Sequence, residues 1–222
     1  AEVEYADHVS QSVFVKFPVA DEDNTHLIIW TTTPWTLPAN LAVAYNSRFT
    51  YKKVCVNGEA YIVESTLLPK VAETCGWENV EEIESLPGDA VGALKYRHPF
   101  INKTAKLYAG DTFVENSTGT GFVHVAPGHG MDDYHLGCAN DLPIYCPVDD
   151  DGKFAHTDDL PLAEQMPADL LGKSILEKNG KSEANEAVLE LLRDKAALVH
   201  QENYTHSYPH CWRSKTPVIF RG

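Results

Sequence analysis

Short segments rich in β-branched and aromatic residues recur along the first half of the chain, and this pattern predicts strands. Asn57 and Gly58 separate two of these segments and favour a tight hairpin turn between them. The predicted strands cover residues 13–17, 27–31, 51–56, 61–63, 90–96, 106–108 and 122–125.

Helical patterns dominate the second half. One short helix is predicted in the first half, over residues 66–75 and ended by Gly76, and the first helix of the second half is predicted over residues 132–140. The clearest helical segments are residues 170–178 and 183–198, with Ser182 as the N-cap of the second. The apolar stripe of that helix consists of Ala184, Val188, Leu191 and Leu192. The chain ends in a strand-like segment, residues 218–221, an ending typical of a fragment of a longer protein.

The composition is that of an ordinary globular protein, with 43% hydrophobic and 23% charged residues among 222. That length suffices for one large domain or two small ones. No apolar run approaches the roughly 20 residues of a membrane-spanning helix. Residues 1–5 lack the features of a secretory signal, so the cytoplasm is the expected compartment. The net charge of −14 argues against broad nucleic-acid binding, although it is compatible with docking one terminal nucleotide.

Residues 30–40 read W-T-T-T-P-W-T-L-P-A-N. Three consecutive threonines suit the end of an extended strand, and Pro34 cannot donate to a strand ladder. Hydroxyl and backbone groups are therefore available there, although a simple strand-to-turn junction also explains a threonine run. Trp35, Thr36 and Asn40 add an aromatic wall, a hydroxyl and an amide, and they favour a small polar pocket.

Residues 119–134 read G-T-G-F-V-H-V-A-P-G-H-G-M-D-D-Y. If residues 122–125 form a strand, His124 faces the side opposite to its two valine neighbours. The glycines around His129 permit a close chain reversal that brings the next helix start back toward His124. A carboxylate of Asp132 or Asp133 there could bind a cation such as a substrate ammonium, or could simply cap the helix.

The sequence predicts neither a metal site nor a cofactor site. The five cysteines form no C-x-x-C pair, which favours reduced thiols over structural zinc: Cys55, Cys75, Cys138, Cys146 and Cys211. His124, His129, Asp132, Asp133 and His135 lie close in sequence but lack the spacing of known hydrolase metal motifs, including H-E-x-x-H. Dinucleotide, Walker and G-x-S-x-G signatures are also absent.

Together these segments resemble the editing domains of class I aminoacyl-tRNA synthetases, which share a threonine-rich peptide and a glycine-rich segment with an essential Asp. Residues 207–217, S-Y-P-H-C-W-R-S-K-T-P, are similar to the path by which the isoleucyl family returns to its catalytic domain. Three motifs in this order favour the isoleucyl branch over the leucyl and valyl ones. The H-I-G-H and K-M-S-K-S signatures are absent, so residues 1–222 are expected to be one editing domain of a larger ATP-binding synthetase, without synthetic activity.

The resemblance implies an α+β fold with a β-barrel-like core decorated by helices. It also implies hydrolysis of valine from tRNA for isoleucine, with valyl-adenylate as a second candidate substrate and no cofactor in this domain. Binding alone discriminates poorly between side chains that differ by one methylene, a limit for which this enzyme family is the standard example. A second site must therefore remove the wrong product.

Carried over by position, Asp133 would hold the α-ammonium group, and His124 would border the side-chain pocket and help to exclude isoleucine. The threonines would contact the ribose and ester and position water. The expected catalytic residues are Asp133, Thr31, Thr32, Thr33 and His124, and the expected substrate-binding residues are Trp35, Thr36 and Asn40 together with Asp133 and His124.

Three alternatives stay open. The same fold could edit threonine on tRNA for valine, act as a non-catalytic module that positions tRNA, or be a metallohydrolase. Under the main interpretation the partners are the 3′ adenosine of the tRNA and the rest of the synthetase, with no membrane, and the domain is a monomer.

Overall fold

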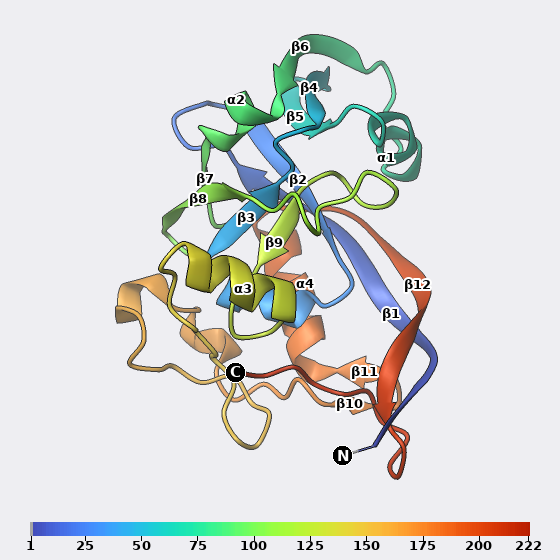
Figure 1. The fold of residues 1–222 in the computed structure, drawn as a ribbon, viewed down its shortest axis with the longest axis vertical. Helices are drawn as coiled ribbons and strands as arrows, with labels where there is room; N and C mark the ends of the chain where they lie inside the picture. Colours follow the sequence, from blue (N-terminus) through green and yellow to red (C-terminus); the bar gives the residue numbers. More distant parts are fainter. Residues whose placement is uncertain (1) are drawn as a thin grey trace.

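The computed structural model describes residues 2–222, whose strands form two larger sheets and one small hairpin (Figure 1). The six-stranded sheet has the order β12-β1-β2-β5-β4-β6. Its strands are β1 (Val3–Pro18), β2 (Thr25–Thr31), β4 (Thr50–Val56), β5 (Glu59–Glu64), β6 (Glu81–Pro87) and β12 (Leu198–Cys211). The four-stranded sheet has the order β7-β8-β3-β9. Its strands are β3 (Ala42–Tyr45), β7 (Lys95–Arg97), β8 (Thr104–Ala109) and β9 (Val123–Val125). The hairpin pairs β10 (Glu177–Lys178) with β11 (Lys181–Ser182).

Helices cover the sheets and join their ends. They are α1 (Leu68–Thr74), α2 (Gly88–Gly92), α3 (Met131–Ala139), α4 (Glu183–Asp194) and the 3-10 helices Pro34–Ala39, Leu162–Glu164 and Ala168–Leu170. In α4, Val188, Leu189 and Leu192 are fully buried and belong to the main core. Ser182 caps this helix as predicted, because its hydroxyl accepts the Asn185 N–H at 3.2 Å. No helix within residues 2–222 combines the length and the hydrophobicity needed to cross a bilayer.

The predicted α+β class is confirmed. Within residues 2–222 the strands pair as open sheets and do not close into a barrel. Phe17 of β1 and Tyr96 of β7 pack in the same core cluster, and the bridge between Val19 and Tyr96 ties the two sheets together. The threonine-rich segment leaves β2 at its other end, where Thr31 pairs with Val13, and the 3-10 helix Pro34–Ala39 that follows packs against α4.

The long ribbon of β1 and β12 was only partly predicted. The two strands pair from Val3–Cys211 to Val15–Leu198, and in Figure 1 they run side by side to the end of the molecule that holds both termini. The sequence pattern predicted a strand over residues 13–17 only, and it predicted no strand over residues 198–211. Much of the ribbon is exposed, so it lacks the apolar alternation that burial imposes on a strand.

Two predicted elements are wrong. Residues 90–96 were predicted as a strand, but they begin inside α2, where Val91 is buried, and only the end of the segment joins β7. Residues 170–178 were predicted as a helix. Gly172 instead adopts a φ of 79°, and the backbone of Ile175 bonds to Gly152, so this segment crosses the surface as an irregular chain before β10.

One predicted helix is too long, and one predicted strand is absent. The helix predicted over residues 183–198 ends at Asp194, because Ala196 adopts a φ of 54° and Leu198 already begins β12. The predicted strand over residues 218–221 is not a strand. This segment bonds instead to the glycine turn before α3, with the Gly222 N–H donating to the Gly128 carbonyl at 2.7 Å.

Candidate functional site

A cavity of about 210 Å³ lies between the threonine-rich segment and the start of α3. The predicted site residues that line it are Thr31, Thr33, Thr36, His124 and Asp133, and the other lining residues are Trp30, Val123, Ala126 and His129. The two segments singled out in the sequence, about ninety residues apart, therefore meet around one small cavity.

The threonine-rich segment is shaped by its own side chains. Thr31 ends β2, and its hydroxyl accepts the Thr33 N–H at 3.1 Å. Pro34 begins a 3-10 helix, where a missing N–H costs nothing, and the Thr36 hydroxyl donates to the Thr33 carbonyl at 2.8 Å. The hydroxyl oxygens of Thr31 and Thr33 lie 3.4 Å apart. Only one of the two hydroxyl hydrogens is used in that contact, so the other remains available as a donor to a ligand in the cavity.

His124 is held by a chain of hydrogen bonds that fixes its tautomer. Because the Thr36 hydroxyl spends its hydrogen on Thr33, Nε2–H of His124 must donate to Thr36 Oγ1, at 2.8 Å. Nδ1 is then unprotonated and accepts from Asn40 Nδ2 at 3.0 Å. Behind it, the Tyr96 hydroxyl donates to Asn40 Oδ1 at 2.5 Å.

This arrangement keeps the imidazole neutral. His124 is 8% exposed, and burial lowers the pKa of its ring to about 3, with a smaller contribution from His129. Protonation of Nδ1 would set a hydrogen against the Asn40 amide hydrogens. With both nitrogens engaged, His124 serves as a rigid, uncharged wall of the cavity.

The two carboxylate oxygens of Asp133 differ in their contacts, because one stabilises the local fold and the other has no distant partner. Oδ2 accepts the Ala126 N–H at 2.8 Å, which ties the start of α3 to the end of β9. Oδ1 accepts no side-chain or long-range hydrogen bond within residues 2–222, and the Asp133 side chain is part of the cavity lining. Burial raises the pKa of the Asp133 carboxyl, and a cation beside it would favour the ionised form.

Sequence reasoning did not assign His129 to the site. Its ring stands edge-on to Trp35 with centroids 5.0 Å apart, and its Nδ1–H donates to the Phe220 carbonyl at 3.1 Å. Nε2 is buried without a hydrogen-bond partner within residues 2–222. The G-H-G sequence could have indicated that His129 belongs to the site, because glycines on both sides let its ring approach the cavity. Trp30, the first residue of the threonine-rich motif, also lines the site.

Three predicted residues lie outside the small cavity. Asn40 is fully buried and supports His124 from behind. Thr32 faces two neighbouring cavities, of about 260 and 590 Å³, and Trp35 lines the larger of these. The alternation of a strand end thus sends consecutive threonines to different sides.

Within residues 2–222, no group of three or more His, Cys, Asp or Glu side chains is arranged to hold a metal ion. The candidate site therefore consists of threonine hydroxyls, one half-free carboxylate and a neutral imidazole wall. Such a set can bind an ammonium group, donate to an ester oxygen and orient a water molecule.

Comparison with known proteins identifies relatives along the whole chain. No family model matches. The isoleucine–tRNA ligase of Petrotoga mobilis is 42% identical over 222 residues, covering all of this chain and 22% of that protein. The enzyme of Enterococcus faecalis is also 42% identical, over 227 residues, with 100% and 23% covered. The crystal structure of GlLeuRS-CP1 matches with a TM-score of 0.49 and 16% identity, covering 59% of each chain.

The chain is therefore homologous to part of an aminoacyl-tRNA ligase. Within that class it corresponds to one segment of the isoleucine–tRNA ligases, as the sequence motifs predicted. It spans a little over a fifth of the length of these relatives.

Proposed function

We propose that this chain is an editing domain that hydrolyses valine from tRNA for isoleucine. The observation that carries the proposal is that Asp133, with only its Oδ2 bonded to a distant group, lines the same small cavity as Thr31 and Thr33. An amino acid ester presents an ammonium group beside its carbonyl, and this cavity offers an anion beside hydroxyl donors.

The size of the cavity supports the choice of a small side chain. Its volume of about 210 Å³ is below the roughly 300–1,000 Å³ of typical ligand pockets. It can hold an aminoacyl group but not a whole nucleoside ester. The His124 ring, fixed by Thr36 and Asn40, cannot move aside cheaply for an additional methylene, so valine is accepted and isoleucine is excluded.

In the proposed reaction the Asp133 carboxylate holds the α-ammonium group and so fixes the ester carbonyl near the threonines. A water molecule oriented by a threonine hydroxyl attacks the carbonyl carbon. As the bond between the carbonyl carbon and the ribose oxygen breaks, the proton that the attacking water gives up passes to the ribose oxygen, so valine leaves as the free acid and the tRNA hydroxyl is restored. The spare hydroxyl hydrogen of the Thr31–Thr33 pair stabilises the developing negative charge on the carbonyl oxygen.

The proposal includes no covalent intermediate and no cofactor. His124 has no free nitrogen with which to activate a nucleophile, and Asp133 is engaged by the ammonium group. The proposed partners are the tRNA end and the remainder of the parent synthetase, in the cytoplasm, with the domain as a monomer. Valyl-adenylate stays a second candidate substrate, since it carries the same aminoacyl group.

Deacylation assays test this proposal. The chain should release valine from valyl-tRNA for isoleucine and leave isoleucyl-tRNA intact, with no loss of rate in the presence of a chelator. Sensitivity to the chelator would support a metallohydrolase. Preference for threonyl-tRNA for valine would support the valyl alternative, and failure on every ester would support a non-catalytic module.

A further inference from the structure

The proposed hydrolysis needs a group that accepts a proton from the attacking water. The side chains around the small cavity offer few candidates. Threonine hydroxyls are weakly basic and serve as donors, and the Asp133 carboxylate is occupied by the ammonium group. Both ring nitrogens of His124 are engaged, by Thr36 and Asn40. Among the described residues that line the small cavity, the remaining titratable group is the imidazole of His129.

One hydrogen bond determines the tautomer of His129. A carbonyl oxygen can only accept, so the nitrogen that lies 3.1 Å from the Phe220 carbonyl, Nδ1, must carry the hydrogen. In the neutral ring the other nitrogen, Nε2, then has a free lone pair. Nε2 is buried and has no hydrogen-bond partner within residues 2–222. The ring of His129 therefore holds one unused basic nitrogen.

An unpartnered nitrogen at this position is unusual. Leaving a buried polar atom without a hydrogen bond is costly, so native proteins retain few of them. His129 is part of the lining of the small cavity together with Thr31 and Thr33, where the ester carbonyl is placed. The Asp133 carboxylate reaches back to the next residue, because a Cβ added to Gly130 would lie 2.9 Å from its Oδ1. A water molecule bound between these groups would give Nε2 the partner that it lacks.

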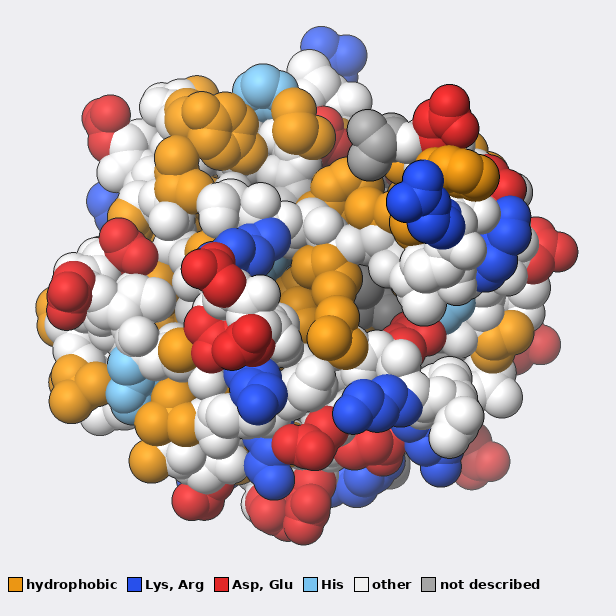
Figure 2. Space-filling model, turned by 90° about the horizontal axis from the view of Figure 1, so that it is seen from below, with side chains coloured by type: hydrophobic (Ala, Val, Ile, Leu, Met, Phe, Trp, Pro, Cys, Tyr) orange, Lys and Arg blue, Asp and Glu red, His pale blue; other side chains and the backbone are white. Residues whose placement is uncertain are grey.

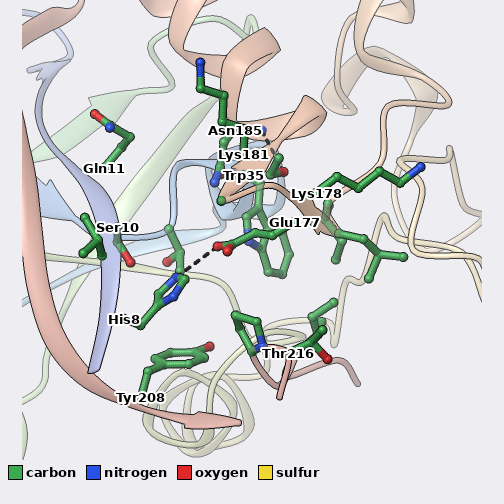
Figure 3. A pocket seen from close by; sticks show the side chains of 18 of the residues that line it. His8, Ser10, Gln11, Trp35, Glu177, Lys178, Lys181, Asn185, Tyr208 and Thr216 are labelled. Carbon is green, nitrogen blue, oxygen red and sulfur yellow. Dashed lines mark hydrogen bonds and ion pairs between the residues drawn. The ribbon is translucent and has the colours of Figure 1, made fainter. Parts of the chain in front are cut away.

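Trp35 holds the ring of His129 from another side. The two rings stand edge-on, at 84° to each other and with centroids 5.0 Å apart. Trp35 lines the cavity of about 590 Å³, the large cavity, which Thr33 lines as well (Figure 3). The backbone N–H of Trp35 donates to Asn185 Oδ1 at 2.9 Å, which anchors this segment to α4. The indole therefore lies between His129 and the large cavity and helps to bury the imidazole.

The charges near His129 come from three elements. They are Asp133 of α3, the neutral His124 of β9, and Arg221, which is paired with Asp150 at 2.9 Å. The threonine-rich segment that packs against the ring has no charged residue. On the end of the molecule seen in Figure 2, acidic and basic side chains are interspersed and form no field of one sign. Burial lowers the pKa of the His129 ring and Arg221 lowers it further, against the hydrogen bond from Nδ1, so the ring is neutral at pH 7.

We propose that Nε2 of His129 is the general base of the hydrolysis. It takes one proton from the attacking water while the water oxygen bonds to the carbonyl carbon. It returns that proton to the ribose oxygen as the bond between the carbonyl carbon and the ribose oxygen breaks, and the ring is neutral again. Between these two steps the Phe220 carbonyl, which accepts from Nδ1, stabilises the positive ring. This inference rests on the proposed editing function, but it can fail separately from it.

Two variants of the full 222-residue chain separate the functions of the two nitrogens. The side-chain amide of His129→Asn matches Nδ1 in position, so it keeps a donor to the Phe220 carbonyl and removes Nε2. His129→Gln places an amide oxygen near the position of Nε2, so it keeps a hydrogen-bond acceptor that cannot take up a proton. Both variants should lower kcat for valyl-tRNA by about 100-fold or more with KM unchanged. A wild-type kcat in His129→Gln would mean that this residue only orients water, and it would overturn the inference.

The pH dependence of kcat gives a second readout. Because the pKa of His129 is lowered from 6.5, the wild-type kcat should be level above that pH and should fall tenfold per pH unit below the lowered pKa. The fall should be absent in His129→Asn. A fall that persists there would belong to Asp133 and would overturn the inference, as would a wild-type kcat that stays level wherever circular dichroism shows the chain to be folded. If His129→Asn does not fold, His129→Gln and the wild-type profile decide.

The matched control is His135→Asn, which changes an exposed histidine of α3 that does not line the small cavity. It should keep both kcat and the pH profile of the wild type. Deacylation by the wild type with an equal kcat in His129→Asn would keep the proposed function and overturn the inference. Absence of deacylation by the wild type itself would overturn the proposed function, and the inference with it.

Discussion

The small and large cavities share the Thr33 wall but satisfy their polar groups differently. Around the small cavity, a directed chain of hydrogen bonds from Tyr96 to Thr36 leaves the His124 ring one orientation and one tautomer. Around the large cavity, Lys178 and Lys181 are exposed and unpaired among the described residues. A pocket whose polar groups are all paired in one arrangement can discriminate between similar side chains, whereas unpaired, exposed side chains can adjust to a ligand.

The largest expected effect is at Asp133. Asp133→Ala should lower the deacylation rate by at least about 100-fold, because losing one partner of a buried ion pair costs about 3–5 kcal/mol. Its cost to the free energy of unfolding should stay within about 1–2 kcal/mol, since the substitution removes the hydrogen bond to the Ala126 N–H and a local one to the backbone of Asp133 itself. Single-turnover deacylation and urea denaturation measure the two effects.

The control for this prediction is Asp132→Ala. Asp132 shares the first turn of α3 but is exposed and does not line the cavity. Comparable loss of activity in both variants would indicate an effect of helix-start charge and would contradict a specific role for Asp133.

The next largest effect is expected for His124→Ala, which should lose discrimination between valine and isoleucine. Removing the ring enlarges the small cavity, so isoleucyl-tRNA should become a substrate and the preference for valine should fall about 10–100-fold, the range that one methylene supplies. The ratio of deacylation rates for the two esters measures this. Thr36→Ser keeps the hydroxyl that holds the ring and should retain the preference. Unchanged discrimination in His124→Ala would remove His124 from the wall.

Acid should weaken the fold through the same imidazole. The pKa of His124 is about 3 when folded and near 6.5 when unfolded, so between these values the unfolded state binds one proton more. Its contribution to stability is complete above pH 6.5 and is lost as the pH falls toward 3, by up to about 1.4 kcal/mol per pH unit, a tenfold change in the folding equilibrium.

The difference in unfolding free energy between the wild type and His124→Gln, measured by urea denaturation from pH 7 to pH 4, isolates this contribution from other titrating groups. His135→Gln changes an exposed histidine of α3 and serves as the comparison. Equal pH dependence in His124→Gln and in the wild type would contradict a buried, neutral His124.

The smallest effect should be at Asn185, which joins the two regions. Asn185→Ala removes the side-chain oxygen that accepts the backbone N–H of Trp35. It should slow deacylation about fivefold, since one such hydrogen bond contributes about 1 kcal/mol. Asn185→Asp keeps an acceptor and should retain the rate on valyl-adenosine. A full rate in Asn185→Ala would show that α4 does not position the threonine-rich segment.

Much of the fold followed from local signals that tertiary packing did not override. Asn57-Gly58 forms the predicted turn between β4 and β5, and Ser182 caps α4. The same Asn-Gly signal at residues 179–180 was overlooked because the apolar residues before it suggested a helix. Gly172, with its positive φ, breaks that pattern, and the apolar residues Leu170 and Ile175 are buried although the chain forms no α-helix there.

The candidate site was predictable in its residues but not in its geometry. Motifs identified Thr31, Thr33, His124 and Asp133, which do meet around one cavity. Asn40 was expected to bind substrate, yet it is fully buried and its hydrogen bond fixes the ring of His124 over a separation of 84 residues. No local pattern encodes such a contact, nor the approach of Phe220 to His129 from the far end of the chain.

The role of Asp133 is tested most directly through the ammonium group of the substrate. Hydrolysis of valyl-tRNA would be compared with that of the same tRNA carrying the α-hydroxy analogue of valine, by the wild type and by Asp133→Asn. The account predicts that the wild type strongly prefers the amino ester, by about 100-fold, and that Asp133→Asn treats both esters alike. If Asp133→Asn lost as much activity on the hydroxy ester as on the amino ester, Asp133 would act on water rather than on the ammonium group, and the account would be contradicted.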